Sequence, residues 1–238
     1  MVYYFTAKTT TSTNNELSDF TLDGYEDENT ITTHIIYMGK DKFENDPLIK
    51  NSNPKNIWFH VDNHSSAHLY LQLTQEQILE WKSFDNFKID EYLLLQICQL
   101  TKSNSIKGNK LNNISICYTP VENLYTDGSM DTGTVTFKNN KQVKRYNIAK
   151  RDNSIINKLN KTKIEKSTEE FLKEQDLFNR ELMNERKRLE RESKELEKQY
   201  SNQKLKNSDP YGDLFTKENL ENSSNDRRKE NWDEDDFW

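Results

Sequence analysis

Two short segments of strictly alternating residues, 57–61 and 67–71, limit the possible folds of this chain more than any other feature. The five residues between them are Asp, Asn, His and two Ser, which favour turns because most of these side chains can hydrogen-bond their own backbone. Neighbouring residues of a strand point to opposite faces, so symmetric pairing about this turn defines four cross-strand pairs. The pairs are Trp58 with Tyr70, His60 with His68, Phe59 with Leu69, and Val61 with Ala67. We therefore expect an antiparallel hairpin with one apolar face and one aromatic and imidazole face.

The aromatic and imidazole face has two main interpretations. It could lie beneath a helix, with the histidines hydrogen-bonded as polar groups of the core. It could instead be an exposed platform on which bases stack and imidazoles bind phosphates or base edges. A zinc site is a third interpretation, but no Cys or carboxylate pair stands nearby at a ligand spacing, so we predict no metal. The sequence leaves the first two interpretations open.

The distribution of apolar residues divides the 238-residue chain into three parts. Strand and helix patterns occupy 1–150, which we predict to be one α+β domain with a mostly antiparallel sheet and a main packing helix over 90–102. A long charged helix is expected over 151–200, and a disordered tail with an acidic, aromatic end over 201–238. Strands are expected at 2–5, 33–38, 114–118, 134–137 and 142–148, with a hairpin turn at 139–140 between the last two. Residues 8–30 should form a flexible loop. Two short helices are expected, one with Asn45 or Asp46 as its N-cap and another after Thr74.

The charged helix contains an incomplete coiled-coil pattern. Leu182, Leu189 and Leu196 recur every seven residues, but the companion positions change from Phe171 and Phe178 to glutamates. A stable coiled coil requires both positions to be apolar over several heptads. We therefore predict a weak coiled coil or a solvated single helix, and we expect the part beyond residue 166 to be dispensable for the core.

Basic residues are concentrated in one part of an otherwise acidic chain. The formal net charge is −6, yet residues 138–166 contain ten Lys or Arg and two acidic residues. Such a stripe is typical of a surface that binds an anionic polymer, although a solvated helix face could have the same composition. The candidate site residues are Trp58, His60, His68 and Tyr70 for the platform, and Lys102, Lys107, Lys110, Lys144, Arg145, Lys150 and Arg151 for phosphate contacts.

Signals for catalysis, secretion and membrane insertion do not appear in the sequence. There is no Gly-rich phosphate loop, HExxH or paired CxxC motif, and we predict a protein that is not an enzyme and needs no cofactor. Cys98 and Cys117 are far apart in apolar segments, which indicates small buried residues in a reducing compartment. With no apparent signal peptide or membrane span, we expect a cytoplasmic location.

Several ordered segments together resemble the coiled-coil domain-containing protein 25 family, whose domain is the NFACT-R domain. They are 1–6, 36–45, 57–61, 65–71, 102–108, 121–124 and 130–133, and Asn56 stands where the family has an acidic residue. The resemblance implies binding of nucleic acid, RNA or DNA, because larger relatives with this domain act on stalled large ribosomal subunits and bind tRNA.

We therefore expect a non-enzymatic protein that binds nucleic acid, RNA rather than DNA, and that associates with the large ribosomal subunit in translation or ribosome quality control. Two alternatives remain. One is a protein-interaction adaptor that acts through the charged helix and the acidic tail, and the other is a DNA-binding member of the family.

Overall fold

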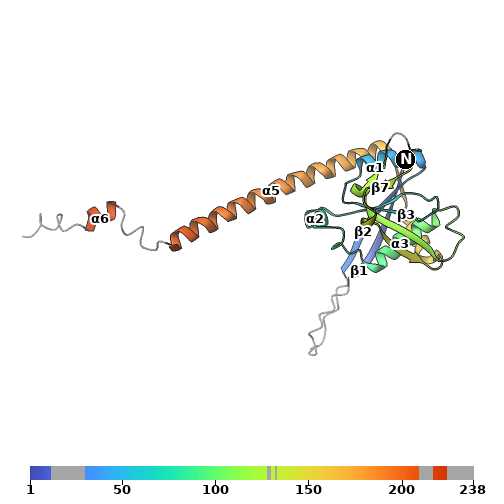
Figure 1. The fold of residues 1–238 in the computed structure, drawn as a ribbon, viewed down its shortest axis with the longest axis horizontal. Coiled ribbons are helices and arrows are strands. Elements are labelled where there is room, and N and C mark those ends of the chain that lie inside the picture. The colour runs from blue at the N-terminus through green and yellow to red at the C-terminus, as the bar shows by residue number, and fades with distance from the viewer. Residues whose placement is uncertain (12–29, 128–129, 132, 209–216, 224–238) are drawn as a thin grey trace, which may run out of the picture. The chain divides into compact units, whose positions relative to one another are not determined.

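A curled seven-stranded antiparallel sheet forms the centre of the fold, in a computed structural model that describes residues 1–11, 30–127, 130–131, 133–208 and 217–223. The strand order is β8-β5-β3-β4-β2-β1-β9. Figure 1 shows β1, β2 and β3 of this sheet together with α3. Its strands are β1 (Val2–Thr11), β2 (Thr30–Gly39), β3 (Ile57–Val61), β4 (Leu69–Gln72), β5 (Ile114–Pro120), β8 (Lys144–Ile148) and β9 (Ile164–Lys166), and β6 (Leu124–Tyr125) pairs separately with β7 (Thr136–Phe137). The helices are α1 (Lys42–Asn51), α2 (Gln75–Leu79), α3 (Glu91–Ser103), α4 (Asn153–Lys161), α5 (Thr168–Ser208) and α6 (Lys217–Ser223), with short 3₁₀ turns at Val121–Asn123 and Asn140–Gln142. The α+β prediction is confirmed.

The central hairpin has the register predicted from its alternation. Trp58 pairs with Tyr70 and Phe59 with Leu69 across β3 and β4. In the turn, Asn63 has a φ of 60°, a left-handed conformation that Asn tolerates better than most residues. The predicted pairing is therefore confirmed for these two pairs, whereas His60 with His68 and Val61 with Ala67 lie outside the ladder of β3 and β4.

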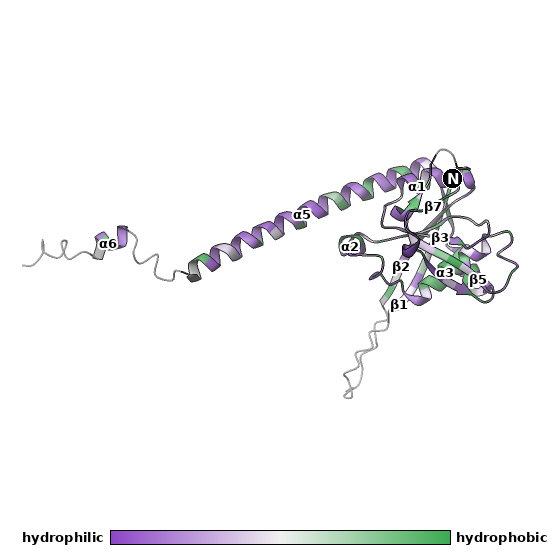
Figure 2. Ribbon diagram, viewed as in Figure 1, coloured by the Kyte–Doolittle hydropathy of each residue, from purple (hydrophilic) through white to green (hydrophobic). Residues whose placement is uncertain are grey.

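One face of the sheet is covered by α3, as the helical pattern indicated. Asp90 caps its first turn by accepting a hydrogen bond from the backbone N–H of Leu93, at 2.9 Å. Ile97 and Leu100 are buried with Phe59 and Leu69 in one apolar cluster. Apolar residues of α3 and the strands stand out against the hydrophilic α5 in Figure 2. This cluster is the main core.

The opposite face of the sheet is also buried. Trp58, Tyr70 and Tyr37 form a second cluster with Leu48 of α1 and Phe171 of α5. The rings of Tyr37 and Tyr70 stack with centroids 5.0 Å apart. Residues that come from distant parts of the chain therefore cover the face whose environment the sequence left open.

Three local predictions are wrong. The turn at 139–140 does not join a hairpin, because β7 pairs with β6 and β8 pairs with β5. The N-cap of α1 is Asp41, so Pro47 lies inside that helix rather than at its start. The predicted loop over 8–30 begins and ends in strand, since β1 continues to Thr11 and β2 starts at Thr30; residues 12–29 lie outside the described part.

The compact unit extends past the predicted boundary at residue 150, to Leu182. Ile155, Ile156 and Leu159 of α4 are buried, whereas Ile164 is exposed. Phe171 and Leu182 of α5 join the two cores, so the start of this helix packs on the domain. A second unit follows from residue 183. Within the tail predicted to be disordered, 201–208 and 217–223 are helical, and the acidic aromatic end lies outside the described residues.

Candidate nucleic-acid interface

Three rings of the central hairpin form a cluster on the second face of the sheet. His60 and Trp58 are two residues apart on β3, and their rings are nearly parallel, with centroids 5.4 Å apart. His68, just before β4, stands edge-on to both, with centroids 5.1 Å from Trp58 and 5.3 Å from His60. The cross-strand contact between the histidines therefore exists as predicted.

These rings do not form an exposed platform. Trp58 and Tyr70 are 1% and 0% exposed, and His68 is 4% exposed, because α1, α5 and the β6-β7 pair pack on this face. The prediction that bases stack on exposed rings of Trp58 and Tyr70 is wrong, since buried rings offer no face to a base. His60 alone is partly exposed.

A hollow of about 440 Å³ lies over the exposed part of this cluster. Trp58, His60 and His68 line it together with the turn after β3 and the segment before β7. Across the sheet, His60 pairs with Cys117 of β5, which also lines the hollow, and Cys117 pairs with Arg145 of β8. The sequence did not indicate that Cys117 lines the hollow, because only the pairing of β3 with β5 places it beside His60.

The two imidazoles in the hollow are neutral at pH 7. Burial lowers the pKa of His68 to about 3, and the neighbouring His60 contributes to this shift. Burial also lowers the pKa of His60. At the rim, Asp62 accepts a hydrogen bond from Nε of Arg145 at 2.9 Å. Lys42 of α1 also lines the hollow, so its lining carries one basic and one acidic side chain, Lys42 and Asp62, and little net charge.

Exposed cations gather on a neighbouring loop. Lys107 and Lys110 lie in the segment 104–113 after α3, and Lys150 and Arg151 follow β8. The two segments are joined: Asn113 N–H donates to the Ala149 carbonyl at 2.8 Å, and Arg151 donates to Asn109 Oδ1 at 2.8 Å. We call Lys107, Lys110, Lys150 and Arg151 the basic loop surface.

The basic loop surface borders the hollow through the turn after β3. Ser66 lines the hollow and forms an isolated bridge with Ser105. Ser105 Oγ donates to the Ser65 carbonyl at 2.7 Å, and Ala67 N–H donates to the Asn104 carbonyl at 3.2 Å. These contacts hold the loop and the rim of the hollow side by side.

Two predicted phosphate contacts have structural roles instead. Lys102 is buried, and its Nζ donates to the carbonyls of Gly108 and Leu111, which holds the loop that bears Lys107 and Lys110. Lys144 Nζ donates to the Phe84 carbonyl at 2.8 Å and lies 4.4 Å from the Phe84 ring centroid. Both cations are engaged with the protein, so the structure does not present either ammonium group to a phosphate.

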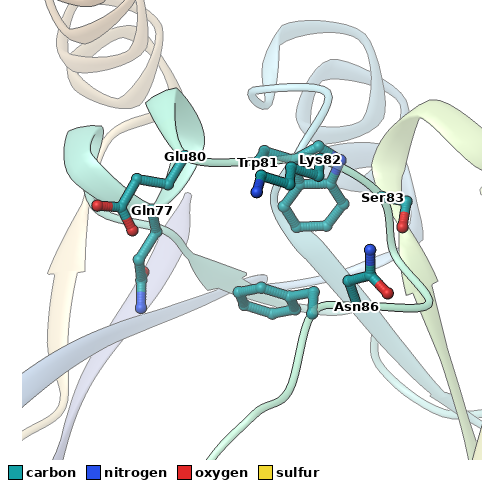
Figure 3. Close-up of a pocket in the computed structure, with 7 residues that line it drawn as sticks. Gln77, Glu80, Trp81, Lys82, Ser83 and Asn86 are labelled. Carbon is teal, nitrogen blue, oxygen red and sulfur yellow. The ribbon is translucent and has the colours of Figure 1, made fainter.

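A second hollow, of about 230 Å³, lies beside α2. Figure 3 shows Trp81 and Lys82 over it, with Gln77 and Glu80 to one side and Ser83 and Asn86 to the other. Lys55 Nζ lies 5.3 Å from the Trp81 ring centroid. Trp81 follows the end of α2 and is partly exposed.

No cluster of three or more His, Cys, Asp or Glu that could hold a metal ion occurs among the described residues. Within the same part of the chain, no helix is long and apolar enough to cross a membrane.

Comparison with known proteins identifies the domain. The sequence profile of the NFACT protein RNA-binding domain matches residues 20–139, half of the chain. This match places the chain in the class of NFACT RNA-binding domains, which gives it a nucleic-acid-binding role and points to a non-catalytic binding protein.

The curated relatives narrow the assignment. The chain is 40% identical to coiled-coil domain-containing protein 25 of Mus musculus over 70% of its own length and 67% of the mouse protein. It is 46% identical to the Danio rerio protein of that name, over 56% of the chain and 61% of the relative, and 42% identical to Protein JLP2 of Saccharomyces cerevisiae, over 56% and 62%. The chain belongs to the coiled-coil domain-containing protein 25 family.

Among solved structures, the chain is similar to the C-terminal part of the fibronectin/fibrinogen-binding protein of Streptococcus suis. The sequence identity is 20% and the TM-score 0.42, over 55% of this chain and 45% of the other.

Proposed function

We propose that this protein binds RNA through the basic loop surface, without catalysis, and that its target is a tRNA or an RNA of the large ribosomal subunit. The observation that carries the proposal is the joining of four exposed cations from two segments into one surface of a domain whose family is defined by RNA binding. RNA is favoured over DNA because the family profile is described by RNA binding.

The loop geometry suits phosphate contacts. Lys107, Lys110 and Lys150 make no ion pair with an acidic side chain within the described part of the chain, and Arg151 bonds only a neutral amide there. Elsewhere, exposed cations such as Arg188 and Lys194 are paired with glutamates along α5. Free cations on a fixed loop release counterions when they meet a phosphate backbone, which gives sequence-independent affinity.

The salt dependence of binding tests this proposal. In the full chain, the double variant Lys107→Ala with Lys110→Ala should flatten the plot of log affinity for a single-stranded RNA against log salt by about 0.7 for each lost contact. Lys50→Ala, which removes an exposed lysine of α1, is the matched control and should leave the slope unchanged. Equal slopes for all three proteins would refute the basic loop surface as the RNA-binding site.

Target choice requires a separate measurement. A tRNA, a large-subunit preparation and a DNA of the same length should be compared at one salt concentration, because affinities at different salt cannot be ranked. Tighter binding to tRNA or to the subunit than to DNA supports the ribosomal role. Tightest binding to DNA would favour the DNA-binding alternative.

A protein-interaction role for the second unit is supported by one observation. Leu189 and Leu196 lie seven residues apart on α5 and are 41% and 52% exposed. Such a seam can pair with another helix, although glutamates at the companion positions weaken it. Replacement of both leucines by Glu should abolish association with any helical partner and leave RNA affinity unchanged.

A further inference from the structure

Two buried polar atoms at the hollow over β3 have no hydrogen-bond partner within the described part of the chain. They are Nε1 of Trp58 and Nδ1 of His68, on side chains that are almost fully buried and that line the hollow. Buried polar groups of proteins are nearly always hydrogen-bonded, to water or a ligand where no protein group is available. The orphaned pair therefore indicates that something polar belongs in this hollow.

The floor of the hollow suits a flat ring. His60 is partly exposed and lies parallel to the buried indole of Trp58, while Phe137 stands at 67° to that indole, with centroids 5.8 Å apart. The volume of about 440 Å³ is within the range of small-molecule sites. A planar ring can thus meet aromatic surface below it and polar atoms at its edge.

The charged groups of the lining nearly cancel, because Lys42 of α1 and Asp62 carry one charge of each sign. Both imidazoles are neutral at pH 7 because burial lowers their pKa values, and the guanidinium of Arg145 is paired with Asp62. A neutral imidazole offers one donor and one acceptor, and the indole N–H offers a further donor. This set matches the mixed donors and acceptors of a neutral heterocycle.

We propose that the hollow receives one unstacked nucleobase of a single-stranded RNA, with the base edge toward His68 and the base plane against His60. This inference rests on the proposed function, because it requires that the protein binds RNA. The contacts between Ser66 and Ser105 place the hollow next to the basic loop surface, so one strand can set a base in the hollow and its backbone on Lys107 and Lys110. Single-stranded RNA is commonly read in this way, by splayed bases.

Uncharged nucleosides test the hollow without the phosphate contacts. Adenosine, guanosine, cytidine and uridine would each be titrated into the ¹⁵N-labelled full chain, with the Trp58 indole signal assigned from Trp58→Phe. At least one nucleoside should shift the Trp58 indole signal and the ring signals of His60 and His68, and the Lys107→Ala/Lys110→Ala variant should show the same shifts. If no nucleoside moves these signals while salt-dependent RNA binding persists, the base site is refuted and the proposed function stands.

Abasic RNA provides the second test. A single abasic position in a short single-stranded RNA should weaken binding about 5- to 150-fold when it falls at the base that enters the hollow, and far less elsewhere. His60→Ala should lose this difference between intact and abasic RNA, whereas His34→Ala, a partly buried histidine of β2, should keep it. Equal affinity at every abasic position would overturn the proposal. The melting temperatures of both variants show whether they are folded. If His60→Ala is unfolded, the nucleoside titration of the unaltered protein decides whether the base site exists.

Discussion

The imidazole of His60 lies parallel to the indole of Trp58, with planes 4° apart, although only His60 reaches solvent. Both side chains leave the same face of β3. Trp58 belongs to the second buried cluster, whereas His60 lies outside that cluster and lines the hollow. Substitutions of Trp58 should therefore change mainly the stability of the fold, and substitutions of His60 should change mainly the binding of RNA.

Substitution of Trp58 tests the core half of the pair. Trp58→Ala should lower the free energy of unfolding by about 3–5 kcal/mol, because a large buried ring is lost and a cavity remains. Trp58→Phe should cost about 2 kcal/mol or less, since Phe refills most of the volume and the lost N–H has no protein partner. Urea denaturation measures both. Equal costs for the two variants would mean that the indole N–H has a partner after all.

Stability should fall as the pH drops below about 6.5. The folded-state pKa of His68 is about 3, below its ordinary value of 6.5, so the unfolded chain binds an extra proton between these values. Between pH 7 and pH 5 this amounts to a loss of about 2 kcal/mol from His68, and His60 adds to it in the same direction. His68→Gln should reduce this pH dependence in denaturation experiments. A variant with the pH dependence of the unaltered protein would contradict the buried, neutral state of His68.

Lys102 should control the loop that it supports. Lys102→Met keeps the aliphatic stem but leaves the carbonyls of Gly108 and Leu111 without their donor, at a cost of about 1–3 kcal/mol. Amide exchange of Gly108 and Asn109 should accelerate, and RNA affinity should fall because Lys107 and Lys110 lose their fixed position. Lys50→Met is the control. Unchanged exchange in Lys102→Met would show that the buried ammonium does not hold the loop.

Asp62 should limit RNA affinity. Asp62→Asn frees Arg145 and removes a negative charge from the rim of the hollow, so binding to RNA should strengthen. Stability should change by less than about 1 kcal/mol, because the partner guanidinium is exposed and such pairs contribute little. Affinity at two salt concentrations, together with thermal denaturation, checks both statements. Weaker binding by Asp62→Asn would instead assign the carboxylate a direct role with the ligand.

The first turns of α5 should be necessary for the compact unit. Phe171 is fully buried and packs on Tyr37, with ring centroids 5.3 Å apart. Phe171→Ala should lower the free energy of unfolding by about 3–5 kcal/mol, whereas Leu196→Ala, on an exposed position of the same helix, should change it by less than about 0.5 kcal/mol. Equal stability of the two variants would restore the shorter domain that the sequence indicated.

The sequence by itself determined the parts of this protein that depend on local pattern. The alternation and turn at 57–71 specified the pairing of Trp58 with Tyr70, because a slip by one residue would turn the apolar set out of the core. Asp90 and the apolar stripe after it specified α3, and the cations of the basic loop surface were among the predicted contacts. Such features need no knowledge of distant residues.

Only the tertiary structure decided which of these residues remain accessible. Leu48 of α1 and Phe171 of α5 both cover Trp58 and Tyr70, and no local pattern records that meeting. The burial of Lys102 likewise depends on how its loop folds back over it. Alternation assigns a side chain to a face of a sheet, but what covers that face depends on long-range packing, and packing separates the core residue Trp58 from the accessible residue His60.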